Sequence, residues 1–249
     1  MALPPVGCQL IVFGKQNQAN PDAVLDCVAA AGYAAVEGGG GDPHEYRRKL
    51  DARGLKAGGM HTGLKRLQEN LPSIIDRLNV LGCTDLSNSG LFVWDERSLA
   101  DWKAAVKVLN DAGRTLRSEG VHLHYHNHAF EFSEKIDGER TAMDLLLDEL
   151  NFDVVDFCID VGWVKVAGAD PAAFLLEHKD RIGYLHLKDH DGATWAELGR
   201  GNVDWPSVMA VLPQLDGVRW AMIEQDSTQI DPCESATISR RYLQETFNY

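Results

Sequence analysis

Hydrophobic and polar residues repeat along this chain with two different periods. Eight short runs have the composition or the alternation of a β-strand, at residues 9–14, 34–38, 55–61, 84–89, 121–127, 155–160, 182–189 and 219–226. Other stretches carry apolar residues every three or four positions, the period of an amphipathic helix, near 21–31, 43–53, 64–81, 98–118, 141–150, 171–180, 205–215 and 233–246. The pattern therefore predicts alternating strands and helices from one end of the chain to the other.

The stretch at 98–118 has the clearest helical pattern. Ser98 suits the N-cap, apolar residues follow at helical spacing from Leu99 to Leu116, and Gly120 ends the segment. Strict alternation of strand and helix predicts a parallel sheet. Eight such units in 249 residues favour an α/β fold with a single (β/α)8 TIM barrel over an open doubly wound sheet. No Pro- or Ser-rich linker divides the chain, so we expect one domain over residues 1–249.

The segment VHLHYHNHAFEF, residues 121–132, places a histidine at every second position. Side chains alternate between the two faces of a strand, so the four imidazoles share one face and Val121, Leu123 and Tyr125 share the other. We expect the two earlier histidines to fill the barrel interior and the two later ones to reach its rim, where function is favoured: His122 and His124, then His126 and His128.

The same parity places polar residues inside the barrel near the carboxyl ends of other strands: Glu37, His61, Asp160, His186, Lys188 and Glu224. The strand ends of a barrel converge on one mouth, which is where enzymes of this architecture keep their active sites. Two carboxylates and an imidazole on neighbouring strands suit Mn²⁺, Mg²⁺, Co²⁺ or Zn²⁺, and a bound cation also explains how buried acids can lie together.

Each of these residues also has a structural interpretation. Asp160, His186 or Glu224 alone would more often be a hydrogen-bonding residue of the framework, and their joint position at three successive strand ends is what favours a site. The run GGGGD at 38–42 lacks the Lys-Ser/Thr of a P-loop, which favours a flexible loop. Trp163 is expected to pack in the core or to form a pocket wall.

Composition narrows the class of partner. The chain has 24 Lys and Arg against 37 Asp and Glu, a formal net charge of −13, and so acidic a surface repels the phosphates of nucleic acids. No apolar run is long enough to span a membrane, and the N-terminus lacks the pattern of a signal peptide. The five cysteines have no CxxC spacing and are expected to be reduced thiols of a cytoplasmic protein.

Four ordered motifs resemble a known family: YHNHAFEF, CIDVGWVKVAGADP, YLHLKDHDGATWAELGRGNVDWPSV and MIEQD. They are similar to the xylose-isomerase-like TIM barrels, also called sugar phosphate isomerases/epimerases. This family includes ketose 3-epimerases, hydroxypyruvate isomerase, inosose dehydratase, dehydroshikimate dehydratase and DNA-repair enzymes of the endonuclease IV type. The resemblance covers essentially the whole chain and is densest from residue 121 onwards.

The resemblance implies one divalent metal ion held by Glu, Asp, His and Glu from the last four strands. Asp160, His186 and Glu224 match three of these ligands, and we take Glu131 as the fourth, with His126 as the alternative. Glu131 can reach the metal only if the chain bends after Asn127.

The chain also departs from the epimerases of the family. Trp163 stands where they carry a His, and their substrate-binding Arg after the metal His is missing, with Lys188 and His190 nearby. These departures weigh against simple ketose epimerisation.

The first functional hypothesis is a metal-dependent sugar isomerase or epimerase that abstracts a proton next to a carbonyl through a metal-stabilised enediolate. Glu131 and Glu224 would move the protons and His128 would assist, while the substrate would be bound by Glu37, His61, His126 and Lys188. The runner-up is a dehydratase acting on a keto-sugar or inosose-type substrate. An endonuclease IV-type enzyme and a non-catalytic sugar-binding barrel rank below these. We expect a small sugar or polyol-like substrate, no nucleic acid and no membrane, and the chain is compatible with a homo-oligomer.

Overall fold

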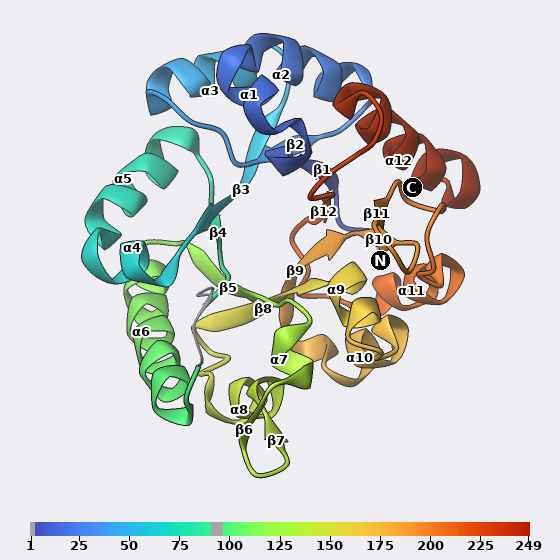
Figure 1. The fold of residues 1–249 in the computed structure, drawn as a ribbon. Helices are drawn as coiled ribbons and strands as arrows, with labels where there is room; N and C mark the ends of the chain where they lie inside the picture. The colour runs from blue at the N-terminus through green and yellow to red at the C-terminus, as the bar shows by residue number, and fades with distance from the viewer. Residues whose placement is uncertain (1–2, 91–96) are drawn as a thin grey trace.

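Eight parallel strands close into a barrel in the computed structural model, which describes residues 3–90 and 97–249 (Figure 1). Around the barrel the strands follow the order β1-β12-β9-β8-β5-β4-β3-β2. Their bounds are β1 Val6–Gln9, β2 Ala35–Glu37, β3 Lys56–Thr62, β4 Asp85–Asn88, β5 His122–His126, β8 Val155–Asp160, β9 Ile182–Leu187 and β12 Ala221–Ile223. The first strand pairs with the last, with Val6 opposite Ala221, and this pairing closes the ring.

Helices surround the barrel and separate consecutive strands (Figure 1). The longer ones are α2 Pro21–Ala30, α3 Pro43–Asp51, α5 Leu71–Leu81, α6 Leu99–Ser118, α8 Ala142–Glu149 and α12 Pro232–Phe247. The shorter ones are α1 Gly14–Ala19, α4 Leu64–Glu69, α7 Phe130–Ser133, α9 Val161–Val166, α10 Pro171–Glu177 and α11 Trp205–Val211. The predicted single (β/α)8 barrel is therefore confirmed. Within the described residues, no helix is long and apolar enough to cross a membrane.

The core has two parts, which correspond to the two faces of the strands. Outward-facing side chains such as Leu123, Phe157 and Leu185 pack against the helices in one large apolar cluster. Inside the barrel a second, smaller cluster is formed by Ala35, Cys158, Tyr184 and Met222. This division agrees with the predicted strand parity, in which every second residue faces the lumen.

Two of the predicted elements differ from the structure. The strand predicted at 9–14 ends at Gln9, and Leu10–Phe13 forms a 3-10 helix in which Leu10 and Phe13 point into the core. The Gln9 side chain accepts a hydrogen bond from the N–H of Ile11 and so caps this turn. The helix predicted at 64–81 is two helices that meet at Asn70, because the second begins with Pro72 in its first turn.

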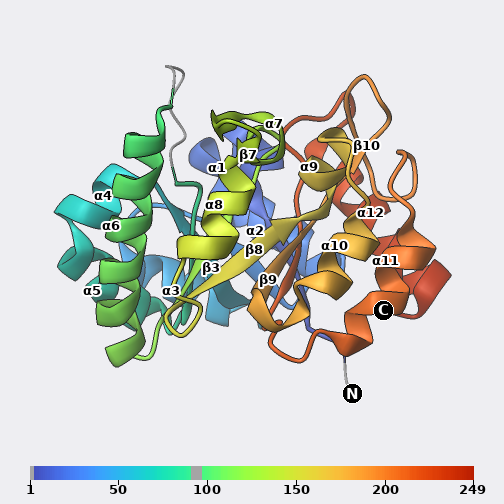
Figure 2. The same cartoon turned by 90° about the horizontal axis from the view of Figure 1, so that it is seen from below.

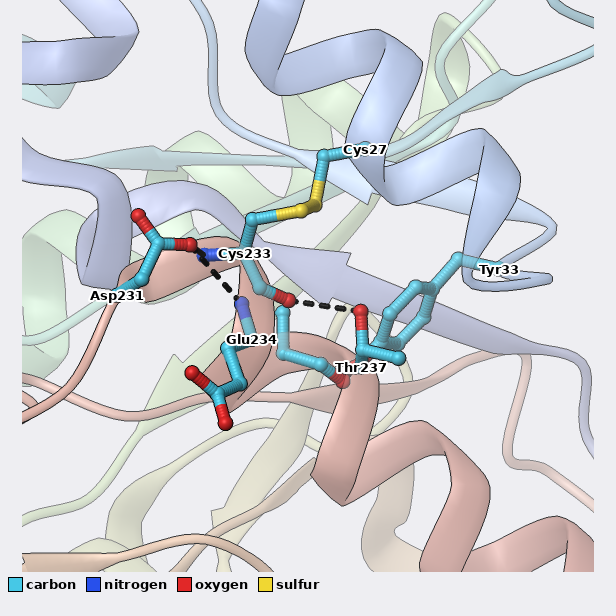
Figure 3. The surroundings of a disulfide bond; sticks show 7 residues. Cys27, Tyr33, Asp231, Cys233, Glu234 and Thr237 are labelled. Carbon is cyan, nitrogen blue, oxygen red and sulfur yellow. Dashed lines mark hydrogen bonds between the residues drawn. A yellow bond between two sulfur atoms is a disulfide. The ribbon is translucent and has the colours of Figure 1, made fainter.

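The prediction of reduced cysteines is wrong for one pair. Cys27 on α2 and Cys233 in the first turn of α12 form a disulfide, with a Cα–Cα distance of 5.9 Å (Figure 3). These residues are 206 positions apart in sequence, but barrel closure places the two helices side by side (Figure 1). The other three cysteines are free and buried: Cys8, Cys83 and Cys158.

The carboxyl ends of the strands carry the longer connections. Figure 2 shows α7, β7 and β10 together at this end of the barrel. Two small hairpins lie here, β6 Lys135–Asp137 with β7 Arg140–Thr141, and β10 Asp189–His190 with β11 Trp195–Ala196.

One buried carboxylate holds the loop that follows β9. Asp189 accepts hydrogen bonds from the backbone N–H groups of Gly199, Gly201 and Val203 and from the indole N–H of Trp205, at 2.8–3.1 Å. A Cβ at Gly201 would lie 2.1 Å from the Asp189 carboxylate, so glycine is required there. The loop therefore has a defined path with little regular secondary structure.

Candidate active site

Four buried side chains converge at the carboxyl ends of neighbouring strands. His126 ends β5, Asp160 ends β8, His186 lies on β9, and Glu224 directly follows β12. One potential ligand atom from each residue lies within 4.8 Å of the corresponding atoms of the other three. Pairing of Asp160 with His186 across adjacent strands sets this arrangement, because residues paired in a parallel sheet point to the same face. We call these four residues the ligand group.

The ligand group has polar atoms that the described protein atoms leave without a hydrogen-bond partner. They are Oδ2 of Asp160, Nδ1 of His186 and Oε2 of Glu224, all buried. The last two are in direct contact with one another. Buried polar atoms are nearly always satisfied, so carboxylate oxygens and an imidazole nitrogen that face one point without regular hydrogen bonds indicate a cation-binding site. Two imidazoles and two carboxylates fit Zn²⁺, Co²⁺ or Mn²⁺.

Electrostatics also suit a cation at this position. Burial lowers the pKa of His126 well below its usual value, with the nearby His186 adding to the effect, so that His126 is a neutral imidazole able to coordinate a metal ion. Burial would also lower the pKa of His186, but Cys158, Glu224 and Glu37 raise it well above its usual value. Burial raises the pKa of Asp160 to about 7.

Lys188 lies beside the ligand group and balances part of its negative charge. Its buried Nζ is 2.8 Å from Asp226 Oδ1, 3.3 Å from Glu224 Oε1 and 3.5 Å from Asp160 Oδ2. Burial alone would raise the pKa of Glu224, but Lys188 and His186 hold it well below its usual value. The ammonium group also packs against the rings of Trp163 and Trp195, 5.1 and 4.3 Å from their centres. Lys188, which was predicted to bind substrate, is fully buried and is not among the described residues that line the cavity.

Glu37 is fully buried and supports two imidazoles. Its carboxylate lies 2.8 Å from Nε2 of His186 and 3.3 Å from Nδ1 of His61. Burial would raise the pKa of Glu37, but these imidazoles hold it at about 2. The contact orients His186 so that Nδ1 faces the ligand group, the usual role of a carboxylate behind a metal-binding histidine. Glu37 was expected to bind substrate, and the structure places it behind the site.

Glu131 lies outside the ligand group. The chain turns after β5 into the short helix α7, where the Glu131 carboxylate accepts hydrogen bonds from the Tyr125 hydroxyl at 2.8 Å and the His128 N–H at 2.7 Å. Tyr125 faces the outer side of the barrel, and burial raises the pKa of Glu131 to about 8. His126, the alternative first ligand, therefore occupies the place in the ligand group that was predicted for Glu131.

A cavity of about 1150 Å³ opens above the ligand group. His126 and Glu224 belong to both the ligand group and the cavity lining, together with His61, His128 and Asp226. Burial and the charge of Lys188 lower the pKa of His128 to about 3, so this imidazole is neutral at physiological pH. Trp163 also lines the cavity, which agrees with the pocket-wall interpretation.

The two deeper histidines of β5 lie on the lumen side, below the ligand group. His124 is fully buried, and its Nε2 is 3.0 Å from Asp85, which also accepts a hydrogen bond from Arg219. His122 is partly buried and approaches Asp156. Both are held in a charged network of the barrel interior, as expected for lumen-filling residues.

Three residues near the site were not among the predicted functional residues. Asn127 accepts a hydrogen bond from the N–H of Asp160 and so fixes the end of β8. Cys158 places its sulfur 3.7 Å from Nδ1 of His126, on the floor of the site. Asp226 binds Lys188 and lines the cavity. Strand parity already turns Cys158 and Asp226 inward, so this signal was available in the sequence, whereas the role of Asn127 depends on the loop conformation.

Comparison with known sequences gives related enzymes over nearly the full length. The inosose dehydratase of Geobacillus kaustophilus is 26% identical, and the match covers 92% of this chain and 88% of that protein. The inosose dehydratase of Salmonella agona is 23% identical over 98% of this chain and 95% of its own.

Solved structures share the fold. A sugar phosphate isomerase/epimerase from Parabacteroides distasonis has a TM-score of 0.84 at 22% identity, covering 98% of this chain and 94% of its own. The D-allulose 3-epimerase from Methylomonas, solved in complex with D-allulose, has a TM-score of 0.76 at 20% identity, covering 99% of both chains. The sequence model of the xylose isomerase-like TIM barrel matches residues 25–246. This chain therefore belongs to the xylose isomerase-like TIM barrel family.

Proposed function

We propose that this protein is a divalent-metal-dependent enzyme that removes a proton next to the carbonyl of a sugar or polyol-like ketone. The observation that carries the proposal is the convergence of buried ligand atoms of His126, Asp160, His186 and Glu224 within 4.8 Å of one another at the floor of an open cavity. An ion held by these residues would act as a Lewis acid on the substrate oxygens.

Glu224 is the proposed base. It belongs to the ligand group and also lines the cavity, so its two oxygens can serve different partners. Lys188 and His186 hold its pKa low, which keeps it ionised. Glu37 and Lys188 are proposed as positioning residues, because both are buried behind the residues that reach the cavity.

We place dehydration ahead of isomerisation or epimerisation. Epimerisation needs a second acid–base group that faces the opposite side of the substrate, and Glu131 was the predicted carboxylate for that task. Glu131 instead hydrogen-bonds to Tyr125 and is not among the described residues lining the cavity. The similarity to two inosose dehydratases along most of the chain also supports a lyase. Isomerisation remains the second candidate, because His61 and His128 line the same cavity.

The proposed elimination moves two protons. Glu224 takes the proton from the carbon next to the carbonyl, and the electron pair moves onto the carbonyl oxygen. When this electron pair returns, the carbonyl re-forms and a C=C bond forms between the carbon that lost the proton and the carbon beyond it. The hydroxyl of that second carbon takes a proton and leaves as water. His61 is the proposed donor, because it lines the cavity and the Glu37 carboxylate, 3.3 Å from its Nδ1, orients its ring. Its Nε2 lies 2.6 Å from the Ser89 hydroxyl, which lines the cavity and can relay the proton.

Metal binding is tested first. Asp160→Asn should abolish tight binding of Zn²⁺, Co²⁺ and Mn²⁺ by the purified protein, measured by titration calorimetry. Asp156→Asn is the matched control, since Asp156 lies on the same strand and face but contacts Arg117 and His122 away from the ligand group. Equal metal binding by wild type and Asp160→Asn would overturn the proposed site.

The reaction is tested by incubation of the metal-loaded protein with keto-sugars and inosose in D₂O. Loss of water detected by mass spectrometry identifies a lyase, whereas deuterium in an isomer of the substrate identifies an isomerase or epimerase. Asp160→Asn should slow either reaction at least about a hundredfold, because the ion contributes several kcal/mol to the transition state. Absence of both signals with every substrate would argue for a non-catalytic barrel.

A further inference from the structure

The cavity above the ligand group is larger than the proposed chemistry requires. Its volume of about 1150 Å³ exceeds the range of about 300–1,000 Å³ that is common for pockets that enclose drug-sized ligands. A single sugar ring bound at Glu224 would fill only the floor of this space. The remaining volume lies between the loops of the mouth, and its walls differ in character from the floor.

Apolar side chains from separate elements form these upper walls. Ile11 comes from the 3-10 turn after β1, Leu64 from the start of α4, Phe130 from α7 and Trp163 from α9. Ile11 is 46% exposed, an unusual state for a large aliphatic side chain next to a polar reaction centre. Apolar surface that converges from several elements around one cavity marks a binding site for an apolar group.

Polar side chains also line the cavity, among them Gln9, Thr62, Gln68, Ser89 and Ser133. The Gln9 side chain accepts a hydrogen bond from Ile11, and the Ser89 hydroxyl lies 2.6 Å from His61. Lys65 is the only Lys or Arg among the described residues that line the cavity, and it shares the lining with the carboxylates Glu224 and Asp226. A phosphate group would therefore lack a cluster of cations. A neutral substituent with an apolar face fits the walls formed by Ile11 and Leu64 better than a phosphate does.

We infer that the substrate is a sugar that carries an aromatic substituent, an aryl glycoside, with the sugar on the ligand group and the aromatic ring against Ile11, Leu64, Phe130 and Trp163. The inference rests on the proposed function for the sugar end of the site. It adds a second subsite, formed by the apolar walls, that selects the substrate by its substituent. The aliphatic surface of Ile11 and Leu64 would supply the main contacts, and the partly exposed edges of Phe130 and Trp163 would complete the subsite, because Arg97 and His128 cover the faces of the Phe130 ring.

Binding of two inert glycosides tests the subsite. Phenyl β-D-glucopyranoside and methyl β-D-glucopyranoside differ only in the substituent, and their affinities for the metal-loaded protein are measured by titration calorimetry. We expect the phenyl glycoside to bind at least about tenfold more tightly, because the ring buries apolar surface that the methyl group lacks. Equal affinities, or no detectable binding of the phenyl glycoside, would overturn the inference.

Variants of the apolar walls test which residues cause the preference for the phenyl glycoside. Ile11→Asn and Leu64→Asn should reduce the phenyl-to-methyl ratio to about threefold or less and leave the affinity for the methyl glycoside unchanged. Leu176→Asn is the matched control. The side chain of Leu176 is 45% exposed, nearly the same fraction as that of Ile11, but it lies on α10 and does not line the cavity. An equal loss in Leu176→Asn, or an unchanged ratio in both wall variants, would contradict the proposed walls.

The two proposals can fail separately. The D₂O reaction with unsubstituted keto-sugars depends on the ligand group and needs no aromatic substituent. A phenyl preference without proton exchange would remove the proposed reaction and keep the subsite, whereas exchange without a phenyl preference would remove the subsite and keep the reaction.

Discussion

Glu37 holds two imidazoles with one buried carboxylate. His186 and His61 both point a ring nitrogen at it, so the orientation of a proposed metal ligand and that of a proposed proton donor depend on the same residue. Carboxylates in this position fix the tautomer of the histidine and raise its basicity. A substitution at Glu37 should therefore change metal affinity, although Glu37 is not itself a proposed ligand.

Glu37→Gln should lower metal affinity by about 10–100-fold, since the neutral amide cannot polarise the N–H of His186. Competition with a chelating indicator dye measures the change. Glu131→Gln is the matched control, because Glu131 is equally buried and lies outside the ligand group. A larger loss in Glu131→Gln than in Glu37→Gln would instead favour Glu131 as the first ligand.

Metal affinity should also depend on pH through Asp160. Burial raises the pKa of Asp160 to about 7, so in the metal-free protein its carboxyl group carries a proton below that pH. The ion must displace this proton, so affinity should fall by up to about tenfold per pH unit below pH 7, and the raised pKa of His186 extends the dependence above pH 7. Competition titrations from about pH 5.5 to 8 measure this slope. An affinity that is independent of pH would contradict the assignment.

Strand parity accounts for the residues that could be predicted from the sequence. Asp160, His186 and Glu224 end neighbouring strands and face inward, and the alternation of their neighbours is enough to place them together. The same rule fails for Glu131, because it lies beyond the end of β5, where a short helix replaces the strand period. Whether Glu131 or His126 faces the ligand group depends on the path of that turn, which no local pattern specifies.

At the scale of elements, α2 and α12 show how barrel closure creates contacts that are remote in sequence. The first of these helices follows β1 and the second follows β12, and the pairing of β1 with β12 brings them together. The Cys27–Cys233 disulfide joins them at this seam (Figure 3). Cysteine spacing alone could not predict this pair, because five cysteines allow many pairings and the separation of 206 residues carries no signal.

Removal of the disulfide should destabilise the protein. The Cys27→Ser, Cys233→Ser double variant should lose about 2–4 kcal/mol of unfolding free energy, since the crosslink restricts the unfolded chain. For a chain of this size, thermal denaturation should show a fall in Tm of roughly 5–15 °C. Reductant should lower the Tm of the wild type to that of the variant and leave the variant unchanged. A wild-type Tm that is insensitive to reductant would show that this bond does not form in solution.

The whole molecule is an acidic protein built on a barrel, and the alternation of strands and helices in the sequence predicts that barrel. Eight alternating units predict the barrel because each helix must cover the strand pair beside it, whereas the short turn at Leu10–Phe13 was hidden in an apolar run that looks like a strand. The net charge of −13 belongs to no single element, and its consequence is a net repulsion between the protein and polyanions.

This charge predicts that the protein does not act on DNA, although its family includes DNA-repair enzymes. A duplex with an abasic site should show no mobility shift and no cleavage at low salt, where electrostatic attraction would be strongest. A basic DNA-binding protein run in parallel checks the sensitivity of the assay. Retention that weakens as salt rises would contradict the prediction and would point to a local basic groove.

The loop anchored by Asp189 keeps its shape with the help of only a few of its side chains. Its path is set by backbone N–H groups, by one glycine and by the indole of Trp205, while exposed positions such as Ala193 and Thr194 contribute only backbone contacts. Trp195, on the same loop, packs against Trp163 at the rim of the cavity. Mutations at the exposed positions can thus accumulate over generations without loss of the loop's shape. A lineage built on this scaffold could acquire new selectivity by drift at the rim while the ion-binding floor stays the same.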